Sequence, residues 1–158
     1  MPFADPQAVK QEILRQVAAF EALAGAPPTH IDSHQHFHMR DPARAVTAEI
    51  AASLNVPLRA CDPRLMYCGR FYGQTNAGDP LPDLIGVEAL VRILEELPEG
   101  ATELGCHPGL DADLDTMYSR EREREVETLC HPAVRAALVR EGIELRSFAE
   151  LPEAAWPG

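Results

Sequence analysis

The sequence predicts an α/β fold built from parallel strand–helix–strand units. Short apolar runs of strand length alternate with helical patterns along the 158 residues, and such alternation is typical of a parallel sheet with helical crossovers. Histidine motifs end two of the predicted strands, and sites in such folds lie at the carboxyl ends of strands. An open doubly wound sheet and a barrel both satisfy these observations.

The first two helices are predicted from their start signals and their apolar spacing. Asp5-Pro6 combines a capping residue with a first-turn proline, apolar residues recur at helical spacing, and Gly25 ends the segment. Asp41-Pro42 repeats the start signal before a second apolar stripe that reaches Leu54. The chain is therefore expected to begin with two amphipathic helices.

Strand-length segments and further helices complete the expected order. Strands are predicted at the histidine-rich stretch 29–38 and at residues 56–61, 101–106 and 143–148. Helices are predicted at residues 87–97 and at residues 119–140, the latter broken near Pro132.

Residues 62–86 form a predicted loop that is much longer than the usual about four to six residues. Loops of this length tend to be functional, and the aromatic residues Tyr67, Phe71 and Tyr72 are suited to line a pocket. A solvated excursion or a subunit contact explains the loop equally well. We therefore treat Tyr72 as a candidate substrate-binding or supporting residue.

Composition narrows the class of protein. The chain has 14 Lys and Arg against 25 Asp and Glu, a net charge of -11, which disfavours nucleic acid and anionic membranes as partners. The four cysteines form no CxxC pair and follow no secretory signal, so reduced thiols in a cytoplasmic protein are expected. The length suits one domain over residues 1–158.

The stretch THIDSHQHFH places four histidines and one aspartate within ten residues. On an extended strand Asp32, His34, His36 and His38 share one face with His30, and alternate residues lie roughly 6.6 Å apart. Two or three of these five side chains can then bind one metal ion. Histidines that only hydrogen-bond at a strand end are the simpler alternative, and HxH by itself also occurs in unrelated metallohydrolases.

Two motifs, PTHIDSHQHFH and TELGCHPG, resemble those of the YdjC-like deacetylases, and the EVETL and GIELRSFAEL segments extend the resemblance over nearly the whole chain. That family includes chitooligosaccharide deacetylases and hopanoid-associated deacetylase-like proteins. The resemblance implies a distorted (β/α) barrel that binds a divalent metal, magnesium or zinc, and removes acetyl groups from N-acetylated sugars. Members of the family are often dimeric, so the resemblance also implies a homodimer.

The resemblance assigns roles residue by residue. It makes His34 the metal ligand and His107 of CHPG the active-site, or catalytic, histidine. It leaves His36 and His38 as substrate-binding or supporting residues, and Asp32 as a carboxylate that orients a neighbouring imidazole.

Three other features have competing interpretations. Arg59 lies toward the end of a predicted strand and is a candidate substrate contact, although a surface salt bridge explains it almost as well. His131-Pro132 is interpreted as a helix start rather than a ligand. The run SREREREVE, residues 119–127, is interpreted as a solvated helix face.

The family pattern also has parts that this sequence lacks. An NADDFG-like strand, whose aspartates supply a metal ligand and the catalytic base, and a further metal-binding histidine do not occur here. The chain is therefore expected to be the C-terminal portion of such a protein, working as a homodimer or with a separate N-terminal half. A non-catalytic binding or assembly module is the alternative.

Overall fold

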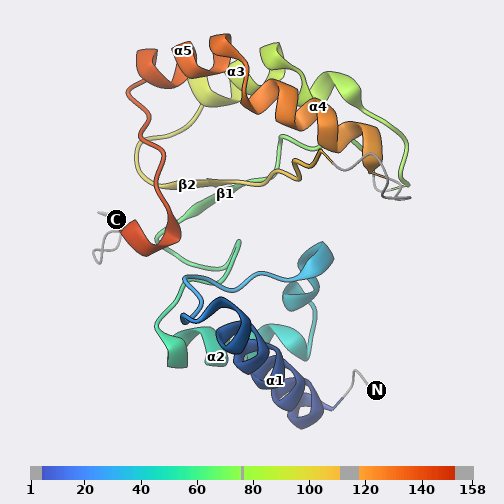
Figure 1. Cartoon of the computed structure of the whole chain (residues 1–158), viewed down its shortest axis with the longest axis vertical. Coiled ribbons are helices and arrows are strands. Elements are labelled where there is room, and N and C mark those ends of the chain that lie inside the picture. The colour runs from blue at the N-terminus through green and yellow to red at the C-terminus, as the bar shows by residue number, and fades with distance from the viewer. Residues whose placement is uncertain (1–4, 76, 111–117, 152–158) are drawn as a thin grey trace. The chain divides into compact units, whose positions relative to one another are not determined.

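The computed structural model describes residues 5–75, 77–110 and 118–151. It divides the chain into two compact units, whose elements are labelled in Figure 1. The first unit comprises Met1–Leu65 with Arg146–Gly158, and the second comprises Met66–Leu145. A single domain over 1–158 remains a prediction.

The first unit begins with the predicted helix, α1 (Pro6–Ala24). The Asp5 side chain accepts a hydrogen bond from the Gln7 N–H at 3.0 Å, and Gly25 closes the helix in the left-handed conformation at φ 67°. The predicted start signal at Asp5 and stop signal at Gly25 are therefore confirmed. Each helps to satisfy backbone groups that have no hydrogen-bond partner within the helix.

The second helix, α2 (Ala43–Leu54), packs against α1. The prediction that Asp41 caps it is wrong in detail: Pro42 occupies the cap position, without a side-chain cap. The core of this unit is made by four buried residues, Val9, Ala43, Val46 and Ile50.

The prediction of an extended strand for the histidine-rich stretch is wrong. Ile31 forms only a single parallel bridge with Leu58, which is also all that remains of the strand predicted at 56–61. The chain then turns into a 3-10 segment, η1 (His34–Met39). The Ser33 hydroxyl accepts the His38 N–H at 2.9 Å, and such local side-chain bonds compete with strand pairing.

The second unit contains a two-stranded parallel sheet, β1 (Met66–Cys68) and β2 (Thr102–Leu104), with Met66 opposite Thr102. The strand predicted at 101–106 is confirmed, in shortened form. The prediction of a continuous loop at 62–86 is wrong, because this segment contains β1 and a 3-10 turn, η2 (Pro82–Ile85). Three residues are too few for strand periodicity to reveal β1.

The helices of the second unit agree with prediction. They are α3 (Val87–Glu95), α4 (Ser119–Leu129) and α5 (Pro132–Arg140), with the expected break before Pro132. They pack around a buried cluster of Cys68, Phe71, Ile85, Leu90, Ile93, Leu94, Val134 and Ala137.

The last predicted strand, 143–148, is not formed. Instead Ser147 and Glu150 make a reciprocal cap that starts the 3-10 turn η3 (Phe148–Glu150), and this cap favours a helical turn over extended chain. The architecture is thus mixed α/β with parallel strands. Among the described helices, none is long and apolar enough to cross a membrane.

Candidate functional site

In the first unit, His38 fastens the turn that carries the other histidines. Its ring is buried, with 1% of the residue exposed. Nε2 donates to the Arg59 carbonyl at 2.9 Å, and Nδ1 lies 2.7 Å from the Ser33 hydroxyl. Because both ring nitrogens are engaged, His38 supports the turn and is not available as a ligand in this arrangement.

Arg59 and Asp32 form an ion pair, with 3.0 Å between Arg59 Nη1 and Asp32 Oδ2. Asp32 also accepts the Ser33 N–H at 2.7 Å. The carboxylate therefore pairs with a guanidinium instead of orienting an imidazole as predicted.

His34 and His36 lie on the turn itself. His34 is exposed, and its ring makes no hydrogen bond with any described residue. The His36 ring meets the His38 ring edge-on at 5.9 Å between centroids. Gln35 and His36 both have φ 52°, a left-handed conformation that is costly for residues with a side chain.

Metal binding depends on how many donor side chains come together. Over residues 5–75, 77–110 and 118–151, no three His, Cys, Asp or Glu side chains come together to hold an ion. A structural or catalytic zinc site uses about three or four protein donors. The described residues thus do not complete a metal site around His34 or elsewhere.

In the second unit, His107 follows β2 and is exposed. Its ring lies edge-on to Tyr72 at 5.4 Å and to Tyr118 at 5.7 Å between centroids, and the two tyrosines stack on each other at 5.0 Å. The structure thus joins the predicted residues His107 and Tyr72 in one aromatic group.

Glu125 of α4 lies beneath this group and is fully buried. Its Oε2 accepts the His107 backbone N–H, and its Oε1 accepts the Tyr118 hydroxyl at 2.5 Å. The Tyr118 oxygen in turn accepts the Gly73 N–H at 2.7 Å. Burial, and then the bond to Glu125, raise the pKa of Tyr118 well above its usual range, so the hydroxyl remains a donor.

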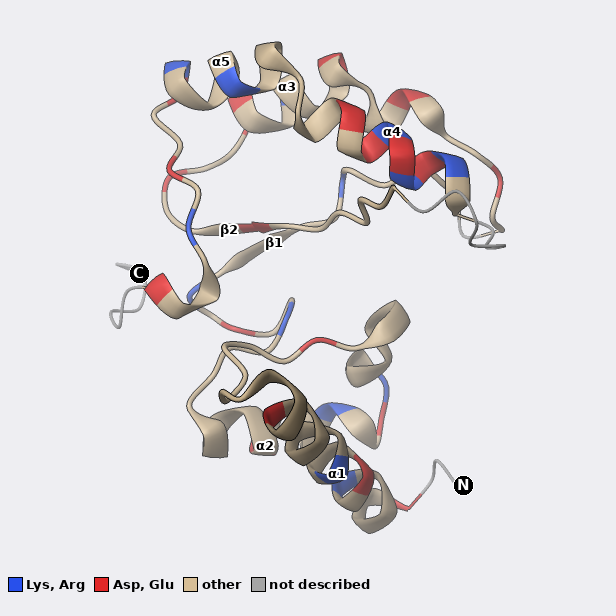
Figure 2. Cartoon of the chain, in the orientation of Figure 1, with Lys and Arg blue, Asp and Glu red and all other residues tan. Residues whose placement is uncertain are grey.

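Tyr118 and Glu125 were missed by the sequence analysis. The interpretation of 119–127 as a solvated face is wrong at Glu125, although both signs of charge do alternate along α4 in Figure 2. The one signal was the pair of apolar residues Val126 and Leu129, at the end of the charged run and just after it, which indicate a helix face turned inward.

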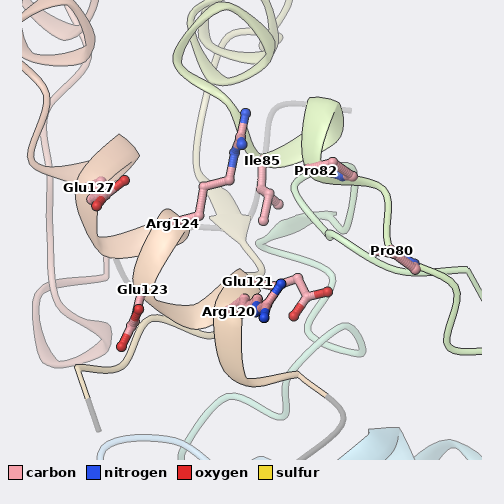
Figure 3. Close-up of a pocket in the computed structure, with 8 residues that line it drawn as sticks. All are labelled: Pro80, Pro82, Ile85, Arg120, Glu121, Glu123, Arg124 and Glu127. Atoms are coloured by element: carbon pink, nitrogen blue, oxygen red, sulfur yellow. The ribbon is translucent and has the colours of Figure 1, made fainter. Parts of the chain in front are cut away.

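His131 has the structural role predicted for it. It is the N-cap of α5, and its Nδ1 accepts the Ala133 N–H at 3.2 Å. Beside α4 lies a shallow hollow of about 390 Å³ (Figure 3). Its lining mixes both charges with prolines: Pro80, Pro82, Ile85, Arg120, Glu121, Glu123, Arg124 and Glu127.

The site candidates fall into two groups. Asp32, His34, His36, His38 and Arg59 belong to the first unit, whereas Tyr72 and His107 belong to the second.

Comparison with known proteins identifies the family. Residues 2–140 match the YdjC-like protein family. The chain belongs to this family. YdjC-like relatives include a chitooligosaccharide deacetylase of Serratia marcescens, 32% identical over 160 residues, which cover 90% of this chain and 60% of the relative. A carbohydrate deacetylase of Vibrio campbellii is 31% identical over 158 residues, covering 92% of this chain and 59% of the relative.

A solved structure shows the same fold. It is a proposed cellobiose-phosphate cleavage protein of Enterococcus faecalis V583, with a TM-score of 0.73 and 24% identity, covering 93% of this chain and 61% of that one. This YdjC-like chain therefore spans about three fifths of the length of the proteins it matches.

Proposed function

We propose that this YdjC-like chain takes part in removing an N-acetyl group from an amino sugar or a chitooligosaccharide-like substrate. The observation that supports this proposal most is the set of contacts made by the His107 backbone and ring. Its backbone and ring faces are held by Glu125, Tyr72 and Tyr118, while its ring nitrogens make no hydrogen bond with the described residues. Family membership and the names of the relatives agree with this reaction.

Hydrolysis of the acetamide adds water to the carbonyl and releases acetate and a free amine. The amine leaves only after its nitrogen gains a proton, and an imidazolium is a suitable donor near neutral pH. We assign this proton transfer to His107. The exposed Tyr72 ring beside it is a suitable face for a sugar ring, because aromatic side chains combine an apolar face with a polar tip.

We also propose a divalent metal as cofactor and a barrel-like closure for the complete fold. A bound metal ion activates water and polarises a carbonyl. His34 is the donor that we assign to it. The described residues do not by themselves complete the site of this ion.

Acetate release from N-acetylglucosamine oligomers tests the function. The full chain should release acetate when zinc or magnesium is added, and His107→Ala should lower the rate on the order of 10²–10⁴-fold, the usual contribution of a general acid. His131→Asn is the matched control, because asparagine keeps the helix cap. Full activity in His107→Ala would refute the assignment.

A second candidate function is a non-catalytic sugar-binding module. It is favoured by the incomplete set of metal donors. Calorimetric titration of the chain with the same oligomers distinguishes the two, since binding without acetate release supports the module.

Metal binding has its own test. Calorimetric titration should give weak zinc binding that is lost in His34→Ala and retained in His131→Asn. Magnesium should bind still more weakly, because it prefers oxygen donors and the proposed donor is an imidazole. Unchanged zinc binding in His34→Ala would remove His34 from the proposal.

A further inference from the structure

We infer that Glu125 is a positioning residue for His107, and that its carboxylate sets the orientation of the His107 ring toward the substrate. The inference rests on the proposed function of His107 and deepens it. Glu125 is fully buried and accepts hydrogen bonds from the His107 backbone N–H and the Tyr118 hydroxyl, so it acts through His107 and Tyr118.

The placement of Glu125 argues for a specific task. Burying a carboxylate is costly unless its oxygens are hydrogen-bonded. Here each oxygen accepts one bond, Oε2 from the His107 N–H and Oε1 from the Tyr118 hydroxyl. One side chain therefore holds both the His107 backbone and the Tyr118 ring, through its hydroxyl.

Tyr118 also connects Glu125 to the segment that follows β1. Its oxygen accepts the Gly73 N–H at 2.7 Å, directly after Tyr72 in the chain. A second link joins the histidine motif to α4, because the Gly109 N–H donates to the Arg122 carbonyl at 3.3 Å. The segments after β1 and after β2 are thus both tied to the start of α4.

Among the described residues, nothing that holds His107 uses its ring nitrogens. The backbone is held by Glu125, and the ring sits edge-on to both Tyr72 and Tyr118. Hydrogen bonds to the ring would fix it equally well but would occupy the atoms needed for proton transfer. Orientation established before substrate binds lowers the barrier of the chemical step.

The first experiment reads the geometry and does not need turnover. In proton NMR of the full chain, the His107 amide proton should lie far downfield, and its ring protons should be shifted by the two tyrosine rings. Glu125→Gln should move the amide proton upfield and change the ring shifts. Glu127→Gln, an exposed change in the same helix, should leave both in place. Unaltered His107 signals in a folded Glu125→Gln protein would overturn the inference.

A second variant covers the case in which Glu125→Gln does not fold. Tyr118→Phe keeps the stacked ring and removes the hydroxyl, which breaks the bonds to Glu125 and Gly73. The His107 amide proton should stay downfield, since its own bond to Glu125 remains, while the ring shifts change. Loss of the downfield amide signal in this variant would contradict a direct hold by Glu125.

The kinetic experiment separates the inference from the proposed function. In an active preparation, Glu125→Gln should lower kcat on the order of 10- to 100-fold, as misplacement of a catalytic group does, with KM unchanged within twofold. A rise in KM alone would overturn the inference. Absence of acetate release in the wild-type chain would count against the function only, and the NMR result would still decide the role of Glu125.

Discussion

Ala60 has φ 55° in the segment after Arg59, a left-handed conformation that disfavours any residue with a Cβ. Non-glycine residues persist there when the surroundings hold them, and such strain is frequent near functional sites. Gln35 and His36, on the turn that carries His34, share this conformation. The first unit therefore stores backbone strain on both segments that its ion pair joins.

Ala60→Gly should raise the free energy of unfolding by about 0.5–1 kcal/mol, because glycine relieves the strain at the cost of a more flexible unfolded chain. Ala19→Gly is the matched control, an exposed position within α1, and should lower it by about 1 kcal/mol. Urea unfolding of both variants checks the pair. Equal destabilisation would show that residue 60 is unstrained.

Tyr118 gives a pH-dependent prediction. Its pKa is raised in the folded protein by burial and by Glu125, so the folded state holds the proton more firmly than the unfolded state, where a tyrosine titrates near about 10. The stabilisation is complete below that pH and declines as the pH rises above it. The stability advantage of wild type over Tyr118→Phe should therefore narrow as the pH rises above about 10 in urea titrations. A constant difference would contradict the raised pKa.

The histidine candidates could be predicted from their spacing, whereas Glu125 could not. A glutamate within a charged run is normally solvated, and its burial depends on the His107 amide and Tyr118, which come from distant parts of the sequence. The arrangement of the histidines themselves was mispredicted because the Ser33 bond to His38 overrides the period-two pattern.

At the scale of elements, the helices were predicted better than the strands. Each helix has many periodic residues, and α1 and α5 also have capping side chains that act locally. The strands β1 and β2 have three residues each and exist because they pair with each other. Pairing between residues 66–68 and 102–104 is not visible in either segment alone.

The inward face of α3 should dominate the stability of the second unit. Leu90 is 1% exposed within the larger core cluster, whereas Leu84 of η2 is 45% exposed. Leu90→Ala should cost about 2–5 kcal/mol through lost burial and a cavity, and Leu84→Ala less than about 1 kcal/mol. Thermal or urea unfolding measures both. A similar cost for the two variants would show that α3 does not pack as described.

At the scale of the whole molecule, the two units have separate cores of different size. The first buries Val9, Ala43, Val46 and Ile50, and the second buries a larger cluster around Phe71, Ile85 and Leu90. Local stability rises with buried apolar contact.

Hydrogen exchange should therefore reveal different local stabilities. Backbone amides in α1 and α2 should exchange faster than those in α3 and α5, because the smaller core opens more readily. Mass spectrometry of exchanged peptides gives the rates. Uniform protection across both units would mean that they unfold as one cooperative body.

Gly73 lies against both the hydrophobic core of the second unit and the group of aromatic rings around His107. A Cβ there would lie 2.7 Å from Ile85 Cδ1 and 3.1 Å from both the Tyr118 hydroxyl and Glu121 Cγ. One added carbon would press on the hydrophobic core and on the histidine site together. Genetic drift at this codon is therefore constrained by two separate contacts, because a variant that accommodates Ile85 would still displace the Tyr118 hydroxyl.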